Sequence, residues 1–93
     1  MKFILLRSNT FVRSAKKFLK KHPEIAPSLQ NTLELLSIEP FHSRLKTHKL
    51  KEEFQDSWAC SGGYDLRIIF KFVEHEGVQA ILLETVGTHD EVY

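Results

Sequence analysis

The sequence predicts an α+β fold, a single domain over residues 1–93. An N-terminal strand and a two-helix hairpin are expected to pack on a mostly antiparallel, twisted sheet. Two patterns predict this class. Apolar residues recur at helical spacing in the first half of the chain and alternate with polar residues in the second half. Because 93 residues bury only one modest core, any functional site should lie on one compact surface.

A short strand and a first helix open the chain. Residues 3–6 are apolar and predict the strand, and Ser8, Asn9 and Thr10 follow as residues that can cap a helix. The helix should bury an apolar stripe and end where His22-Pro23 interrupts the pattern. Its remaining positions form a basic face, made of Arg13, Lys16, Lys17, Lys20 and Lys21.

The second predicted helix is bounded by prolines. Pro27 is compatible only with a first turn, so the helix should begin between Glu24 and Ala26. Pro40 restricts the backbone of Glu39 and should end it. With the first helix it is expected to form an antiparallel hairpin.

The second half is predicted to be mostly strand. Residues 41–55 are irregular and basic and indicate a loop, followed by strands at 57–61, 64–73 and 78–86. The turns between these strands should lie at Gly62-Gly63 and at residues 75–77. In the middle strand, alternation places Asp65 and Arg67 side by side on the face away from the helices.

Charge and cysteine content narrow the class of protein. The net charge is +1, but the basic residues are concentrated before residue 52 and the acidic ones after it. This division suggests a side that faces a polyanion. A single cysteine, Cys60, excludes an internal disulfide. The short apolar start fits neither a signal peptide nor a membrane span, so a cytoplasmic protein is expected.

Three strings, in this order on the predicted elements, resemble the RelE/YafQ toxins of the RelE/ParE superfamily. They are RLKTHKL at residues 44–50, YDLRIIF at 64–70 and VGTHDEVY at 86–93. The resemblance covers nearly the whole chain and implies a RelE-like fold.

The resemblance implies the toxin of a type II toxin–antitoxin system. Such toxins are ribosome-dependent endoribonucleases that cleave translated mRNA by attack of the ribose 2′-hydroxyl on the adjacent phosphate. This chemistry needs a base, an acid and positive charge, but no metal or other cofactor. The expected partners are a cognate antitoxin, in a hetero-oligomer, and the ribosome with its mRNA. No membrane partner is expected.

The same resemblance assigns the candidate site. His48, Asp65 and His89 match site residues of YafQ, and Arg67 matches an arginine of RelE. Tyr93 stands where RelE has a functional tyrosine and YafQ a phenylalanine. The two histidines are expected to share proton transfer and Arg67 to stabilise the phosphate, while Asp65 and Tyr93 orient the substrate or a histidine. RNA phosphates are expected at Arg44, Lys46, Lys49 and Lys51.

Four positions depart from the family pattern. Ser61 and Thr85 stand where YafQ has a histidine and an arginine, and Trp58 and Cys60 stand where RelE has lysines. We interpret Trp58 as a packing residue and Cys60 as a small buried hydrophobe.

Other functions stay open at this point. A ParE-like toxin would share the fold and bind DNA gyrase without cutting RNA, and a degenerate member would only bind antitoxin. His48 and His89 could be ordinary surface histidines. Arg67 could be an ion-pair partner of Asp65, Glu84 or Asp90, and Asp65 could simply cap the turn at Gly62-Gly63. The five histidines lack the paired spacings of zinc ligands, so no metal site is predicted.

Overall fold

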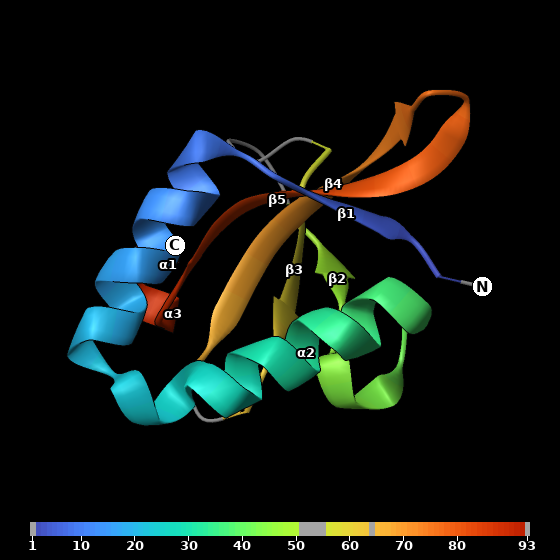
Figure 1. The fold of residues 1–93 in the computed structure, drawn as a ribbon. Coiled ribbons are helices and arrows are strands. Elements are labelled where there is room, and N and C mark those ends of the chain that lie inside the picture. Colours follow the sequence, from blue (N-terminus) through green and yellow to red (C-terminus); the bar gives the residue numbers. More distant parts are fainter. Residues whose placement is uncertain (1, 51–55, 64, 93) are drawn as a thin grey trace.

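The computed structural model describes residues 2–50, 56–63 and 65–92, which form a five-stranded sheet with two long helices on one face (Figure 1). The strand order is β1-β5-β4-β3-β2. β1 pairs with β5 in parallel, and the other neighbouring strands are antiparallel. The predicted α+β class and mostly antiparallel sheet are confirmed.

The elements are β1 (Ile4–Arg7), α1 (Asn9–Lys21), the 3-10 helix η1 (Pro23–Ile25), α2 (Ala26–Ile38), the 3-10 helix η2 (Ser43–Leu45), β2 (His48–Lys49), β3 (Trp58–Ser61), β4 (Arg67–His75), β5 (Val78–Gly87) and α3 (His89–Val92).

α1 begins and ends where the sequence predicts. The Ser8 hydroxyl accepts a hydrogen bond from the backbone N–H of Phe11 at 3.0 Å, which caps the first turn. The helix ends at His22, whose N–H donates to the carbonyl of Phe18. Phe11 and Phe18 are buried against the sheet, and all five basic residues predicted for the outer face are exposed.

α2 follows a 3-10 turn. The helix begins at Ala26 with Pro27 in its first turn and ends at Ile38, before Glu39 and Pro40. Both predicted boundaries are confirmed. In Figure 1, α1 and α2 diverge from η1, so the two arms of the hairpin do not lie side by side as expected. The η1 turn redirects the chain, and each helix packs on the sheet instead.

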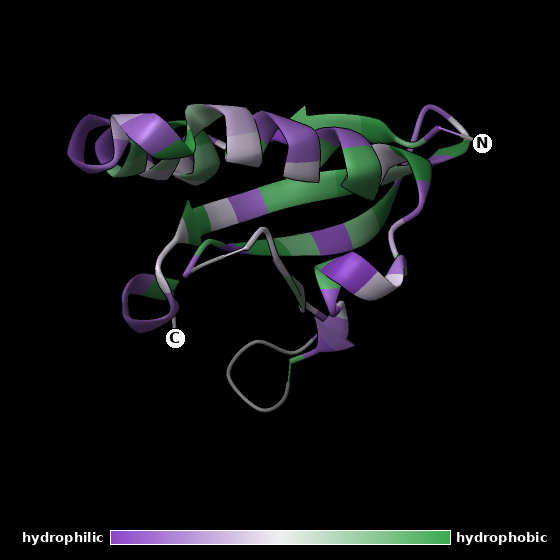
Figure 2. Cartoon of the chain, turned by 90° about the horizontal axis from the view of Figure 1, so that it is seen from below, coloured by the Kyte–Doolittle hydropathy of each residue, from purple (hydrophilic) through white to green (hydrophobic). Residues whose placement is uncertain are grey.

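The main core lies between these helices and the sheet. Ile68 and Phe70 are fully buried on one face of β4, as the predicted alternation requires, and Leu66, directly before the strand, is 1 % exposed in the same core. They pack with residues of both helices, and Figure 2 shows the helices as one layer over the largely hydrophobic strands.

The other face of the sheet, which we call the open face, is partly covered. A small second core there joins Ala59, Ile69 and Val92, with Leu50 packed against it. Figure 2 shows α3 on the side of the sheet opposite the long helices. The sequence did not predict this second core.

Several strand boundaries differ from expectation by a few residues. β4 begins at Arg67, because the N–H of Leu66 donates to the carbonyl of Gly63 and closes a turn before the strand. The predicted start at Tyr64 lies outside the described residues. The predicted loop over residues 41–55 contains η2 and the two-residue strand β2. The turn between β4 and β5 is confirmed, since Glu76 and Gly77 both have positive φ, as a tight two-residue hairpin turn requires.

Among residues 2–50, 56–63 and 65–92, no helix has the length and apolar character needed to cross a bilayer.

Candidate functional site

A depression on the open face joins residues from separate segments of the chain. It is lined by Lys46, His48, Ser61, Arg67 and His89. Strand pairing explains the grouping. Ser61 pairs with Arg67, which pairs with Gly87, in one row across three strands. His48 pairs with Ala59, two residues before Ser61, and therefore points to the same face.

His48 is held by its own backbone. Its Nδ1 lies 3.0 Å from the carbonyl oxygen of Lys46, a residue in the left-handed conformation with φ of 51°. A carbonyl oxygen can only accept a hydrogen bond, so Nδ1 carries the proton. In the neutral ring Nε2 then holds the lone pair, and this exposed histidine can accept a proton there.

His89 begins a short helix that the string THDE builds. The hydroxyl of Thr88 accepts the N–H of Glu91 at 3.3 Å, and the Glu91 carboxylate accepts the N–H of Thr88 at 2.9 Å. This reciprocal pair is a capping box, which fixes the first turn of α3. The His89 ring lies 3.5 Å from the Asp90 carboxylate, but Asp90 is 99 % exposed, so this ion pair contributes little.

Glu91 also connects α3 to α1. Its carboxylate lies 3.7 Å from Nζ of Lys21. The hydrogen bond from the backbone of Thr88 is the main cause that lowers the pKa of Glu91, and the charges of Lys21 and Lys17 lower it further.

Asp65 supports His89 and does not lie beside Arg67 on a strand as expected. It lies in the turn before β4, and its carboxylate accepts the backbone N–H of His89 at 3.1 Å. This contact spans 24 residues and holds the start of α3 against the sheet. Asp65 therefore contacts the backbone of His89.

Arg67 is partly buried at the first position of β4. Its guanidinium donates to the carbonyl of Leu66 at 3.0 Å, which fixes the side chain at the depression. A planar guanidinium suits two-point binding of a phosphate.

The predicted RNA-binding residues are only partly brought together. Lys46 lines the depression with His48, whereas Arg44 lines a different hollow between α2 and Gly62-Gly63. Lys49 follows His48 in β2 and so points to the opposite face of the sheet. Lys51 and Tyr93 lie outside the described residues.

Ser61 was not predicted as a site residue, although it lines the depression opposite Arg67. The departure from the YafQ histidine at this position was the available signal. Trp58 and Cys60, its neighbours in β3, pack in the helix-side core, so side chains at these positions do not reach the open face. Both structural interpretations are confirmed. Burial raises the pKa of the Cys60 thiol to about 12, which suppresses any nucleophilic role.

The part of the chain that the structure describes holds no group of three or more His, Cys, Asp or Glu side chains arranged to bind a metal ion.

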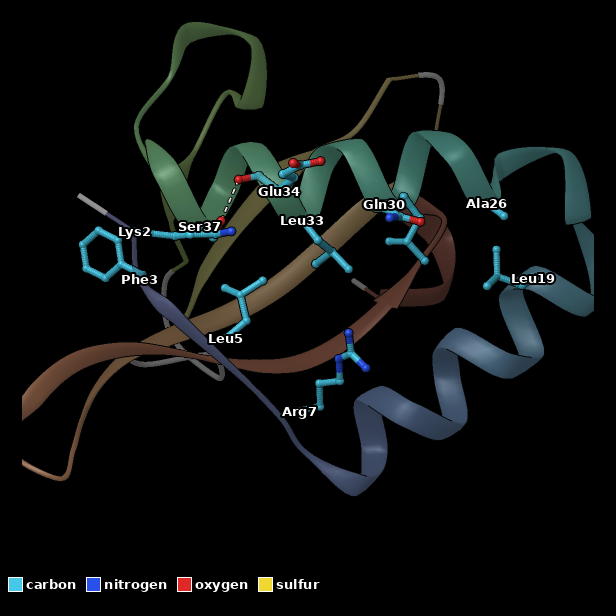
Figure 3. A pocket seen from close by; sticks show the side chains of 11 residues that line it. Lys2, Phe3, Leu5, Arg7, Leu19, Ala26, Gln30, Leu33, Glu34 and Ser37 are labelled. Atoms are coloured by element: carbon cyan, nitrogen blue, oxygen red, sulfur yellow. Dashed lines mark hydrogen bonds between the residues drawn. The ribbon is translucent and has the colours of Figure 1, made fainter.

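A separate groove lies on the helix side, where α1 and α2 diverge above β1 (Figure 3). Its apolar lining comes from all three elements and includes Leu5, Leu19 and Leu33. Lys2 and Arg7 lie among its polar residues. A smaller hollow along α1 shares Arg7, Leu19 and Leu33 and adds Lys16. The two hollows thus share part of their apolar lining, and basic side chains line both, with Glu34 as an acidic residue of the larger one.

Comparisons with known proteins give one family and several similar folds. The family model described as "Bacterial toxin of type II toxin-antitoxin system, YafQ" matches residues 5–93. YafQ from E. coli is similar in structure, with a TM-score of 0.79 and 18% identity over 99% of each chain. The YafQ toxin in the E. coli DinJ-YafQ toxin-antitoxin complex has a TM-score of 0.77 and 18% identity over 100% of this chain and 99% of that one.

A toxin from Helicobacter pylori, solved in a metal-bound form, has a TM-score of 0.75 and 26% identity over 100% of both chains. No curated protein matches the chain significantly in sequence.

Proposed function

Because this chain belongs to the YafQ family of type II toxin–antitoxin toxins, we propose that it is a ribosome-dependent, metal-independent endoribonuclease that cleaves translated mRNA. The observation that carries the proposal is the depression on the open face. Two histidines and an arginine, which come from β2, β4 and α3, meet there. A protein that acts only by binding has no need to assemble this set.

The arrangement supports 2′-hydroxyl attack on the adjacent phosphate. His48 and His89 share the two proton transfers, one removing the 2′-hydroxyl proton and the other protonating the departing 5′-oxygen. Arg67 stabilises the negative charge that develops on the phosphorane. The products are a 2′,3′-cyclic phosphate and a 5′-hydroxyl. Asp65 keeps His89 in place, and Lys46 attracts the RNA backbone.

The shape of the site supports dependence on the ribosome. His48 and His89 are exposed at the rim of a depression on a small sheet, so the toxin has few groups to hold a flexible RNA. The ribosome supplies a message already fixed in an attack-ready geometry. This substrate places the toxin in the cytoplasm.

End mapping tests the reaction. The protein is induced without antitoxin, and message ends are mapped and chemically typed. Cuts inside translated frames with cyclic phosphate ends are expected. Intact messages together with DNA damage would contradict the proposal and favour gyrase binding.

Purified components test ribosome and metal dependence. Message on ribosomes should be cut, and naked RNA cut poorly. Comparable cleavage of both would exclude ribosome dependence.

Metal analysis tests metal independence. The purified toxin should contain no stoichiometric transition metal, and finding one would overturn metal independence. The test is needed because the similar toxin of Helicobacter pylori was solved in a metal-bound form.

The antitoxin should bind the groove between α1, α2 and β1 through an apolar segment with acidic flanks. The apolar lining and the basic residues Lys2, Arg7 and Lys16 support this choice, as does the exposed basic face of α1. Arg7→Glu and Lys16→Glu should each weaken antitoxin binding about 10-fold or more, since each reverses a charge at the interface. Calorimetric titration measures the affinity, and Lys49→Glu on β2 is the control. Unchanged affinity in both groove variants would exclude this site.

A further inference from the structure

A cluster on the open face, farther along the same strands than the depression, has no role in the chemistry above. It consists of Ser57, which directly precedes β3, Lys71 of β4 and Glu84 of β5. The Ser57 hydroxyl donates to the Glu84 carboxylate at 2.7 Å, and Nζ of Lys71 lies 3.7 Å from the same carboxylate. We call this cluster the cross-strand clamp.

A β-bulge in β5 turns the side chain of Glu84 toward Ser57. Ile69 pairs with Thr85 and Phe70 pairs with Leu83, so Glu84 is the extra residue in β5. A bulge changes the direction of a side chain, and here Glu84 and Thr85 both line a hollow on the open face. Ser8 fixes the bulge from outside, because its hydroxyl donates to the Glu84 carbonyl and its N–H donates to the Leu83 carbonyl.

Ser57 links the cross-strand clamp to the segment that carries His48. Ser57 is 3 % exposed, and its carbonyl accepts the N–H of Leu50 at 2.9 Å. Leu50 follows β2, whose two residues, His48 and Lys49, pair only with β3 at the edge of the sheet. An edge strand of two residues has few contacts of its own, so its position depends on the Leu50–Ser57 bond beside it.

We propose that Glu84 is a positioning residue that fixes Ser57, and through it β2, so that His48 meets Arg67 and His89 in the depression. The effect on cleavage rests on the proposed ribonuclease function, whereas the effect on the position of β2 rests on the contacts described above. The hydrogen bond from Ser57 to a carboxylate is the essential contact, since such charge-assisted bonds are strong. The pair with Lys71 is minor, because both side chains are about one-third exposed.

The first test needs no RNA. Amide hydrogen exchange at Leu50 and the NMR signals of the His48 ring are measured in the parent, Glu84→Ala, Glu84→Gln and Ser57→Ala. Loss of a charge-assisted bond should speed exchange at Leu50 about 10-fold or more in Glu84→Ala and Ser57→Ala, and shift the His48 signals. Glu84→Gln keeps an acceptor oxygen but loses the charge, so its exchange should fall between that of the parent and that of Glu84→Ala. Exposed Glu74 on β4 provides the control, Glu74→Ala.

The second test measures cleavage of ribosome-bound message. Glu84→Ala and Ser57→Ala should lower kcat about 10- to 100-fold with little change in KM, because His48 is misplaced while RNA still binds. The double variant should be no worse than either single variant, since both remove the same bond. Antitoxin binding verifies that the variants fold.

Two results would overturn the proposal: Leu50 exchange and His48 signals unchanged in Glu84→Ala, or Glu84→Gln as impaired as Glu84→Ala. If the parent itself cuts no message, the ribonuclease function fails, while the exchange data still decide whether the clamp holds β2.

Discussion

At the scale of single residues, His48, Arg67 and His89 have complementary chemistry. Nδ1 of His48 donates a hydrogen bond to the Lys46 carbonyl, and the guanidinium of Arg67 donates one to the carbonyl of Leu66. His89 is held through its main chain by Asp65. Each of the three is positioned by backbone contacts, so each can be replaced without opening the main core.

His48→Ala, Arg67→Ala and His89→Ala should each slow cleavage about 10² to 10⁴-fold, because each removes a proton-transfer group or the phosphate charge. Growth arrest on induction and cleavage on ribosomes measure the effect. His75→Ala, at the β4–β5 turn, is the matched control and should stay toxic.

Two outcomes would count against this assignment. If all three variants remain as toxic as the parent at equal abundance, these residues do not form the site and gyrase binding gains. If they lose toxicity together with antitoxin binding, their role is structural.

Cys60 should be chemically inert in the folded protein. It is fully buried, and burial raises its pKa to about 12, so almost no thiolate exists near neutral pH. A thiol reagent at pH 8 should label the denatured chain completely and the native chain hardly at all. Mass spectrometry of the intact protein checks this, and full labelling of the native protein would contradict the buried position.

At the scale of elements, the contacts of the Glu91 carboxylate that hold α3 in place depend on pH. The pKa of Glu91 is lowered from 4.5 in the folded state, so its contribution to stability is fully present above pH 4.5. The contribution is lost as the pH falls through the lower folded-state value. We therefore expect the amide signal of Thr88, which donates to the Glu91 carboxylate, to change in NMR spectra below pH 4.5. Glu91→Gln should abolish this transition, whereas Asp90→Asn, at a 99 % exposed position, should keep it.

At the scale of the whole molecule, the helix-side core determines stability. Phe70 is fully buried at the centre of the main core, among residues of both long helices and the sheet. Phe70→Ala should lower the free energy of unfolding by about 3 to 5 kcal/mol, through lost burial and a residual cavity. Urea unfolding measures the change. Val78→Ala, at a half-exposed position, should change it by less than about 0.5 kcal/mol. A similar loss in both variants would contradict the assigned core.

Much of the fold could be predicted from the sequence, because its signals are local. The Ser8 cap, the stop at Pro40 and the tight turn at Glu76-Gly77 each depend on residues within a few positions of one another. The alternation of Ile68 and Phe70 likewise fixes which face of β4 is buried. Asp65 and Leu66 were the exception: the turn closed by the hydrogen bond between Leu66 and Gly63 lies where the strand was expected to start.

The candidate site was predicted only as a set of residues. The sequence and its family resemblance named His48, Arg67 and His89, but only tertiary structure showed that Ser61 joins them and that Lys49 faces away. These facts depend on strand register, which forms between segments far apart in the chain. The contact between Asp65 and His89 spans 24 residues, and that between Ser57 and Glu84 spans 27. The sequence by itself therefore determined the elements and the chemistry available, while the packing of the whole chain decided which side chains meet, because long-range pairing leaves no local signal.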